Sequence, residues 1–121
     1  MAKILKCEEC GSIIQVFVDG DGDACDAHML EIPVQTEGEK APKHKPVVEI
    51  DGDKVTVKVG EAAHPMDEDH YIQFIVLSAG AEQYAKCFKP GDVAEATFTV
   101  NSTEGAVAQA FCNLHGLWSS E

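Results

Sequence analysis

The sequence predicts an all-β protein, built as an antiparallel β-sandwich with a small separate module at its N-terminus. Three observations support this prediction. Apolar and β-branched residues alternate with polar ones in several short runs, Pro and Gly punctuate the chain at short intervals, and no segment shows the 3.6-residue apolar period of a helix. Short strands joined by frequent turns bury their apolar faces most economically as two packed antiparallel sheets.

The first 36 residues are expected to form the small module. Cys7 and Cys10 are separated by two residues and followed by a glycine, a spacing typical of a metal knuckle in which backbone amides turn towards the sulfurs. The β-branched run at 13–18 predicts a strand, and the residues at 19–23, rich in Gly and Asp, predict a turn.

A metal site in this module needs one more ligand than its thiols provide. A tetrahedral thiolate centre takes four ligands, whereas only Cys7, Cys10 and Cys25 are local, with Asp26 and His28 as the nearest substitutes. One interpretation is a second site for iron or zinc. The other is a vestigial knuckle with free thiols, retained as a folding or dimer-forming element.

Residues 37–121 are expected to form the main domain. Its first segment, 37–45, is polar, contains Gly and Pro, and predicts a linker or exposed loop. The apolar residues at 47–50 and 55–59 flank an Asp-Gly pair, which is the signature of a β-hairpin with a tight turn.

Three further strands are predicted in this domain. Residues 71–77 are almost continuously apolar, which suits a central strand buried on much of both faces. Residues 93–100 alternate between an apolar face and a face of Glu and Thr, as expected for a strand with one face in the core. Residues 106–111 are the last predicted strand, and they lead directly into Cys112.

Composition limits the classes of function. The chain has 21 acidic and nine basic residues and a formal charge of −12, which argues against nucleic acid or an anionic membrane as a partner. Because the sequence contains neither a signal peptide nor an apolar run long enough to span a membrane, a cytoplasmic protein is expected. Five unevenly spaced cysteines indicate reduced or metal-binding thiols rather than a disulfide framework.

The residues after the last predicted strand are a candidate metal-binding turn. Cys112 and His115 lie three residues apart, and Gly116 permits the backbone to turn so that both side chains face one ion. Taken alone, this pair is more simply explained as a buried thiol beside a packing histidine.

The histidines favour the metal interpretation. Four of the five histidines lie at predicted strand ends or in connecting loops, where they can reach the same end of a sandwich: His44, His64, His70 and His115. With Cys112 they offer up to four nitrogens and one sulfur. Because structural zinc prefers a closed tetrahedron, a mixed set of more than four ligands favours iron.

These residues resemble those of the superoxide reductases, the desulfoferrodoxin and neelaredoxin group. Successive ligand positions from His44 to His115 are separated by 20, 6, 42 and 3 residues, and the resemblance covers the chain from about residue 36 to the end. Four local sequences carry it: Lys43-His44, His64-Pro65-Met66, His70-Tyr71-Ile72 and Cys112-Asn113-Leu114-His115-Gly116-Leu117-Trp118.

The resemblance implies an immunoglobulin-like sandwich that holds one mononuclear non-haem iron. His44, His64, His70 and His115 would be equatorial ligands and Cys112 the axial ligand. The implied activity is the one-electron reduction of superoxide to hydrogen peroxide without release of oxygen, chemistry that suits an anaerobe. The alternative is a non-catalytic iron or zinc protein that acts in electron transfer or metal binding.

The resemblance also assigns Lys43 as a candidate catalytic residue. Its charge would draw the anion to the iron and orient water as a proton source. The commoner family pattern has a glutamate two residues before the first histidine, where this chain has Pro42. Either Glu39 takes the place of that glutamate or the oxidised iron is closed by water or hydroxide.

The N-terminal module resembles the family's desulforedoxin-like Fe(Cys)4 module, with one difference. Ala24-Cys25, or Cys25-Asp26 if the alignment shifts by one residue, stands where the family has an adjacent pair of cysteines. The resemblance therefore implies an incomplete iron or zinc centre in a module retained for dimerisation. Electrons would come from an external donor such as rubredoxin, and the assembly would be a homodimer, with a tetramer as the alternative.

Overall fold

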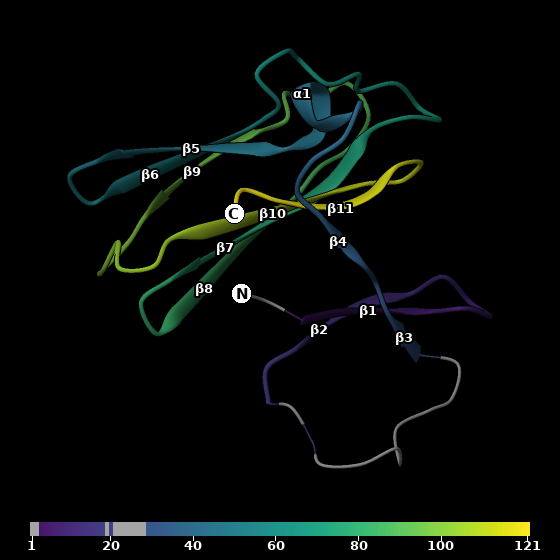
Figure 1. Cartoon of the computed structure of the whole chain (residues 1–121), viewed down its shortest axis with the longest axis horizontal. Coiled ribbons are helices and arrows are strands. Elements are labelled where there is room, and N and C mark those ends of the chain that lie inside the picture. Colours follow the sequence, from purple (N-terminus) through teal and green to yellow (C-terminus); the bar gives the residue numbers. More distant parts are fainter. Residues whose placement is uncertain (1–2, 19, 21–28) are drawn as a thin grey trace. The chain divides into compact units, whose positions relative to one another are not determined.

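The chain divides into two compact units, residues 1–33 and 34–121. The computed structural model describes residues 3–18, 20 and 29–121, which are drawn in colour in Figure 1. Strands make up most of the ordered structure, so the all-β class predicted from the sequence is confirmed. None of the described helices is long and apolar enough to cross a membrane.

The first unit contains a three-stranded antiparallel sheet in the order β2-β1-β3. Its strands are β1 (Lys3–Cys7), β2 (Ile13–Val16) and β3 (Met29–Glu31). The strand predicted at 13–18 is present as β2, and the cysteine knuckle forms the turn between β1 and β2. Except for Gly20, the predicted turn at 19–23 lies outside the described residues, as do Cys25, Asp26 and His28.

The second unit is a sandwich of a five-stranded sheet, ordered β4-β11-β10-β7-β8, and a three-stranded sheet, ordered β5-β6-β9. All pairings are antiparallel except the one between β4 and β11. The elements are β4 (Val34–Gln35), α1 (Ala41–His44), β5 (Pro46–Asp51), β6 (Lys54–Val59), β7 (Ile72–Ala79), β8 (Glu82–Cys87), β9 (Glu95–Thr99), β10 (Val107–Cys112) and β11 (Gly116–Ser119). Figure 1 shows the two sheets as separate layers.

The predicted hairpin and the three further predicted strands are all present. β5 and β6 pair through to Asp51 and Lys54, which leaves a two-residue turn. β7 lies inside its sheet between β10 and β8, as expected for a central strand. The prediction that 106–111 is the last strand is wrong, because β11 follows it and pairs back on β10. The predicted linker at 37–45 contains the single turn of α1, with a proline in its first turn.

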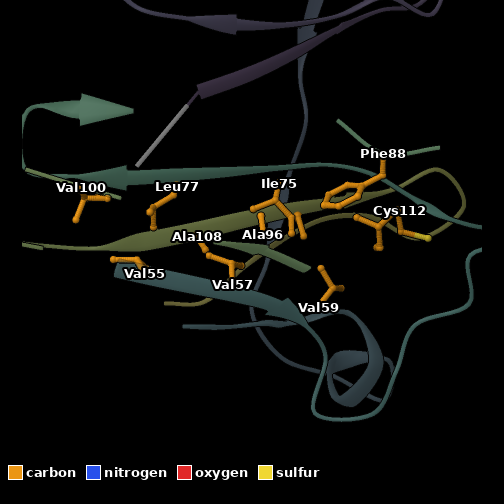
Figure 2. Packing of buried hydrophobic residues seen from close by; sticks show 13 residues of the cluster. Val55, Val57, Val59, Ile75, Leu77, Phe88, Ala96, Val100, Ala108 and Cys112 are labelled. Atoms are coloured by element: carbon orange, nitrogen blue, oxygen red, sulfur yellow. The ribbon is translucent and has the colours of Figure 1, made fainter. Parts of the chain in front are cut away.

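The core lies between the two sheets. Alternate residues of β6 and the inward residues of β7, β9 and β10 form one buried cluster, whose fully buried members include Val55, Val57, Ile75 and Leu77. Cys112, with no exposed surface, belongs to this cluster. Figure 2 shows Cys112 at one end of the row of buried side chains and Val100 at the other. The candidate metal-binding turn therefore begins at the edge of the apolar core, because Cys112 belongs to both.

Candidate metal centre

His44 is the last residue of α1 and is 4% exposed. Its Nδ1 lies 2.8 Å from the carbonyl oxygen of Lys40. A carbonyl only accepts, so Nδ1 carries the proton and Nε2 of the neutral ring is left with a lone pair. The loop after β6 holds this helix in place, because the amide of Ala62 donates to the carbonyl of Pro42 at 3.1 Å.

His64 and His70 lie in the segment between β6 and β7. Nδ1 of His64 lies 2.6 Å from the carbonyl oxygen of Pro65, so the proton again sits on Nδ1 and Nε2 faces inward. The amide of Asp67 donates to the carbonyl of His70 at 2.9 Å and closes the acidic turn between the two histidines. Nε2 of His70 is buried and has no hydrogen-bond partner among the described residues.

Cys112 and His115 are set by a break in the β7–β10 ladder and by the turn that follows it. Phe111 pairs with Phe74, but Cys112 pairs with Ile72, so the intervening residue of β7 forms a bulge. Gly116 begins β11 with a φ of 85°, a conformation that glycine adopts without strain. The carbonyl of His115 accepts two hydrogen bonds, from Gln35 Nε2 at 2.7 Å and from Trp118 Nε1 at 3.1 Å.

The four imidazole rings form a closed square. Going round it, the ring centroids are 4.5 Å apart for His44 and His64, 4.8 Å for His64 and His70, 5.0 Å for His70 and His115, and 4.8 Å for His115 and His44. Neighbouring rings are nearly perpendicular, whereas the opposite rings of His44 and His70 are 6.3 Å apart and inclined by only 26°.

The ligand atoms point at a common centre. One side-chain donor atom each from His44, His70, Cys112 and His115 lies within 4.8 Å of the others. Nε2 of His64 joins this group at 3.0 Å from Nε2 of His44, and Nδ1 of His115 lies 3.1 Å from the same atom. Cys112 Sγ is 3.8 Å from Nδ1 of His115. Donor atoms of all five residues therefore lie close together.

The protonation states of the rings favour a cation at this centre. Burial away from water lowers the pKa of His64 from 6.5 to about 4 and also lowers the pKa of His44 and of His115. Neutral His44 and His64, both protonated on Nδ1, place two lone pairs 3.0 Å apart, and these cannot hydrogen-bond to each other. A metal ion would satisfy them together with the unpartnered Nε2 of His70.

Lysines gather around the first histidine. Lys40 and Lys43 are exposed, and Lys45 is half-buried. The positive charge of Lys40 contributes to lowering the pKa of His44 and of His115, so its ammonium group acts on the cluster. Lys43 was singled out from the sequence because it matches the lysine that precedes the first histidine in the family that the chain resembles. Lys40 was not, since nothing in the sequence placed its charge near His115.

The proposed second site is only partly described. Cys7 and Cys10 lie in one turn, where the amide of Cys10 donates to Cys7 Sγ at 3.4 Å. Cys10 Sγ lies 3.2 Å from Ser12 Oγ, and a hydrogen bond from this hydroxyl to the thiolate is the largest cause that lowers the pKa of Cys10 to about 7. The knuckle geometry is thus present, while Cys25 lies outside the described residues. A metal at this site stays a prediction.

A β-sandwich with a square of imidazoles and a buried thiol defines a class of small metal-binding proteins. The sequence profile of the desulfoferrodoxin family matches residues 36–121 of the chain. The desulfoferrodoxin homolog of Archaeoglobus fulgidus is 44% identical over 98% of this chain and 95% of its own length. The chain belongs to the desulfoferrodoxin family.

Two relatives carry a more specific name. The superoxide reductase of Thermococcus kodakarensis is 33% identical over 77% of this chain and 96% of its own length. The crystal structure of the superoxide reductase from Treponema pallidum is similar over 100% of this chain and 98% of that chain, with 34% identity and a TM-score of 0.76. Both units of this chain, residues 1–33 and 34–121, therefore have a counterpart in that superoxide reductase structure.

Proposed function

We propose that this protein is an oxidoreductase that reduces superoxide by one electron to hydrogen peroxide without forming oxygen. The observation that carries the proposal is the square of four imidazoles with the thiol of Cys112 beside it. Relatives named superoxide reductase, one of which matches the whole chain in structure, support the same activity.

Iron is the proposed metal, with His44, His64, His70, His115 and Cys112 as its ligands. When bound, ferrous iron would supply the one electron that the reaction consumes. His44, His70, Cys112 and His115 alone would also make a four-ligand set suited to zinc. Nε2 of His64, 3.0 Å from Nε2 of His44, adds a fifth donor and favours iron over a closed zinc tetrahedron.

The lysines around His44 would bring the substrate to the centre. Superoxide is an anion and the chain carries a formal charge of −12, so the overall field opposes its approach. Lys40 and Lys43 are exposed cations next to the cluster, and they would reverse that field locally. We assign to Lys43 the further role of orienting a water molecule as a proton source, because forming hydrogen peroxide takes up two protons.

Oxygen measurement with purified, iron-loaded protein tests the proposal. Superoxide should be consumed in the presence of a reduced donor such as rubredoxin, with no oxygen evolved. The oxidised protein should be blue from thiolate-to-iron charge transfer, and Cys112→Ser should abolish the colour. Evolution of oxygen, or one zinc and no iron after growth in iron-replete cells, would contradict the proposal.

We also propose that the first unit serves dimerisation and carries an incomplete metal centre. Its described surface exposes large apolar side chains, with Phe17 81% and Val18 85% exposed. Such residues rarely face water without a partner when they are clustered. Phe17→Asp should therefore shift the protein from dimer to monomer in sedimentation, while a wild-type monomer would contradict the proposal. Two irons per chain would contradict the incomplete centre.

A further inference from the structure

We infer that Asn113 is a positioning residue that fixes His70 relative to Cys112 and His115. The inference rests on the proposed metal centre but does not depend on the reaction carried out there. Asn113 follows Cys112 directly, and its side chain is half-buried. Its role is not to bind the metal but to hold together two ligand-bearing segments that are far apart in the sequence.

Three hydrogen bonds connect Asn113 to the backbone on both sides of His70. Its side-chain oxygen accepts from the amide of Tyr71 at 2.9 Å, and its side-chain nitrogen donates to the carbonyl of Asp69 at 3.0 Å. Its own amide donates to the carbonyl of Tyr71 at 3.2 Å. The residues before and after His70 are thus both bound to one asparagine.

These bonds stand where regular strand pairing ends. The ladder between β7 and β10 shifts register after Phe111, and its last pair joins Cys112 to Ile72. Beyond that pair the sheet no longer fixes the segment that carries His70. The side chain of Asn113 extends the hydrogen bonding between the two segments beyond this pair. Its amide group offers a donor and an acceptor like those of a backbone peptide.

The half-buried His70 needs this support more than the buried His44 and His64 do. His44 and His64 are each oriented by a ring nitrogen bonded to a backbone carbonyl. Among the described residues no hydrogen bond joins the ring of His70 to a backbone carbonyl, so the placement of this ring depends more on the backbone that carries it. Asparagine suits the position because aspartate lacks the donor and leucine lacks both groups.

Cobalt binding to the full-length, metal-free protein tests the inference. Co²⁺ affinity is measured by competition with a chelator, and the thiolate-to-cobalt absorption reports whether Cys112 still binds. Asn113→Ala should weaken the affinity roughly 10- to 100-fold, the range seen when groups that orient metal ligands are removed. Asn101→Ala is the matched control, because Asn101 bonds to the exposed side chain of Glu82 at 2.7 Å in another part of the sandwich. Its Co²⁺ affinity should equal that of the wild type.

A double-mutant cycle with His70→Ala shows whether Asn113 acts through His70. In the His70→Ala protein, adding Asn113→Ala should change the Co²⁺ affinity by less than about 3-fold. An equal loss in both backgrounds would overturn the inference, as would an unchanged affinity in the single variant. If Asn113→Ala does not fold, as judged by its thermal unfolding, Asn113→Gln replaces it. That variant keeps the amide but moves it by one methylene, so the same loss is expected.

The outcome is separable from that of the proposed function. Metal binding is measured without superoxide, so a protein that binds Co²⁺ as described but fails to reduce superoxide leaves the inference standing. A wild-type protein that binds no Co²⁺ would overturn the inference together with the metal centre.

Discussion

The indole of Trp118 lies against the imidazole of His44, with ring centroids 5.4 Å apart and planes inclined by 28°. The same indole donates its Nε1 proton to the carbonyl of His115 at 3.1 Å. One buried side chain thus contacts two candidate ligands that are separated by most of the second unit.

Replacing Trp118 should separate these two contacts. Trp118→Phe keeps an aromatic face for His44 but removes the donor to His115, so we expect a loss of about 1 kcal/mol in the free energy of unfolding. Trp118→Ala should cost roughly 3–5 kcal/mol, because it also empties a buried volume. Urea unfolding of the metal-free proteins measures both values. A Trp118→Phe protein as stable as the wild type would show that the hydrogen bond makes no separate contribution, and equal losses in the two variants would show that the buried volume makes none.

Gly60 should tolerate no side chain, because a Cβ there would lie 2.7 Å from the carbonyl of Lys43. Gly60→Ala should therefore displace α1 and weaken metal binding. Gly52→Ala is the control, since Gly52 also has a positive φ but faces open space. The control should lose about 1–2 kcal/mol of stability from backbone strain alone and keep its metal affinity. Identical behaviour of the two variants in chelator competition would contradict the prediction.

The lysines beside His44 should control how fast superoxide arrives. Lys43→Ala and Lys40→Ala should each lower the second-order rate of superoxide consumption roughly 2- to 10-fold at low salt, because each removes a steering charge. The dependence of the rate on ionic strength should weaken as well. Lys54→Ala, in the hairpin strand β6, is the control and should leave the rate unchanged. Stopped-flow measurement of the rate at several ionic strengths tests this, and an unchanged rate in Lys43→Ala or Lys40→Ala would show that the lysine does not steer superoxide.

Acid should destabilise the metal-free protein before its carboxylates titrate. The pKa of His64 is lowered by burial from 6.5 to about 4, so between these values the unfolded chain binds a proton that the folded chain does not. The contribution of His64 is fully present above pH 6.5 and is lost as pH falls towards 4, by up to roughly 3 kcal/mol. Urea unfolding at pH 7.5, 6 and 5 measures it. His64→Gln should flatten this part of the profile.

The strands that the sequence predicted are those with a clear apolar pattern, either alternating between core and solvent, as in β6, or almost continuously apolar, as in β7. Val55, Val57 and Val59 of β6 are all buried, and their spacing of two residues predicted that they share one face of a strand. β8 was missed because it is an edge strand whose residues are largely exposed, so no alternation marks it. β11 was missed because Gly116 and Trp118 were interpreted as part of the metal-binding turn. The helix α1 has four residues, too few to show a period.

The candidate ligand residues could be singled out from the sequence because imidazoles and a thiol have a recognisable metal chemistry and because their motifs resemble those of a known family. The residues that support them were not. Asn113 bonds to Tyr71 and Gln35 bonds to His115 across long stretches of sequence, and both side chains are common in surface loops. Lys40 acts on His115 only because the fold brings α1 against the last turn. Such roles depend on three-dimensional placement.

The short parallel pairing of β4 with β11 limits how this protein can be divided. The family profile begins at residue 36, and every candidate ligand of the main centre lies beyond that point. Yet Gln35, one residue earlier, donates to the carbonyl of His115 at 2.7 Å. A domain excised at residue 36 would keep all five candidate ligands and lose one of the two hydrogen bonds that the carbonyl of His115 accepts. Any modular reuse of this domain should therefore make its cut before Val34.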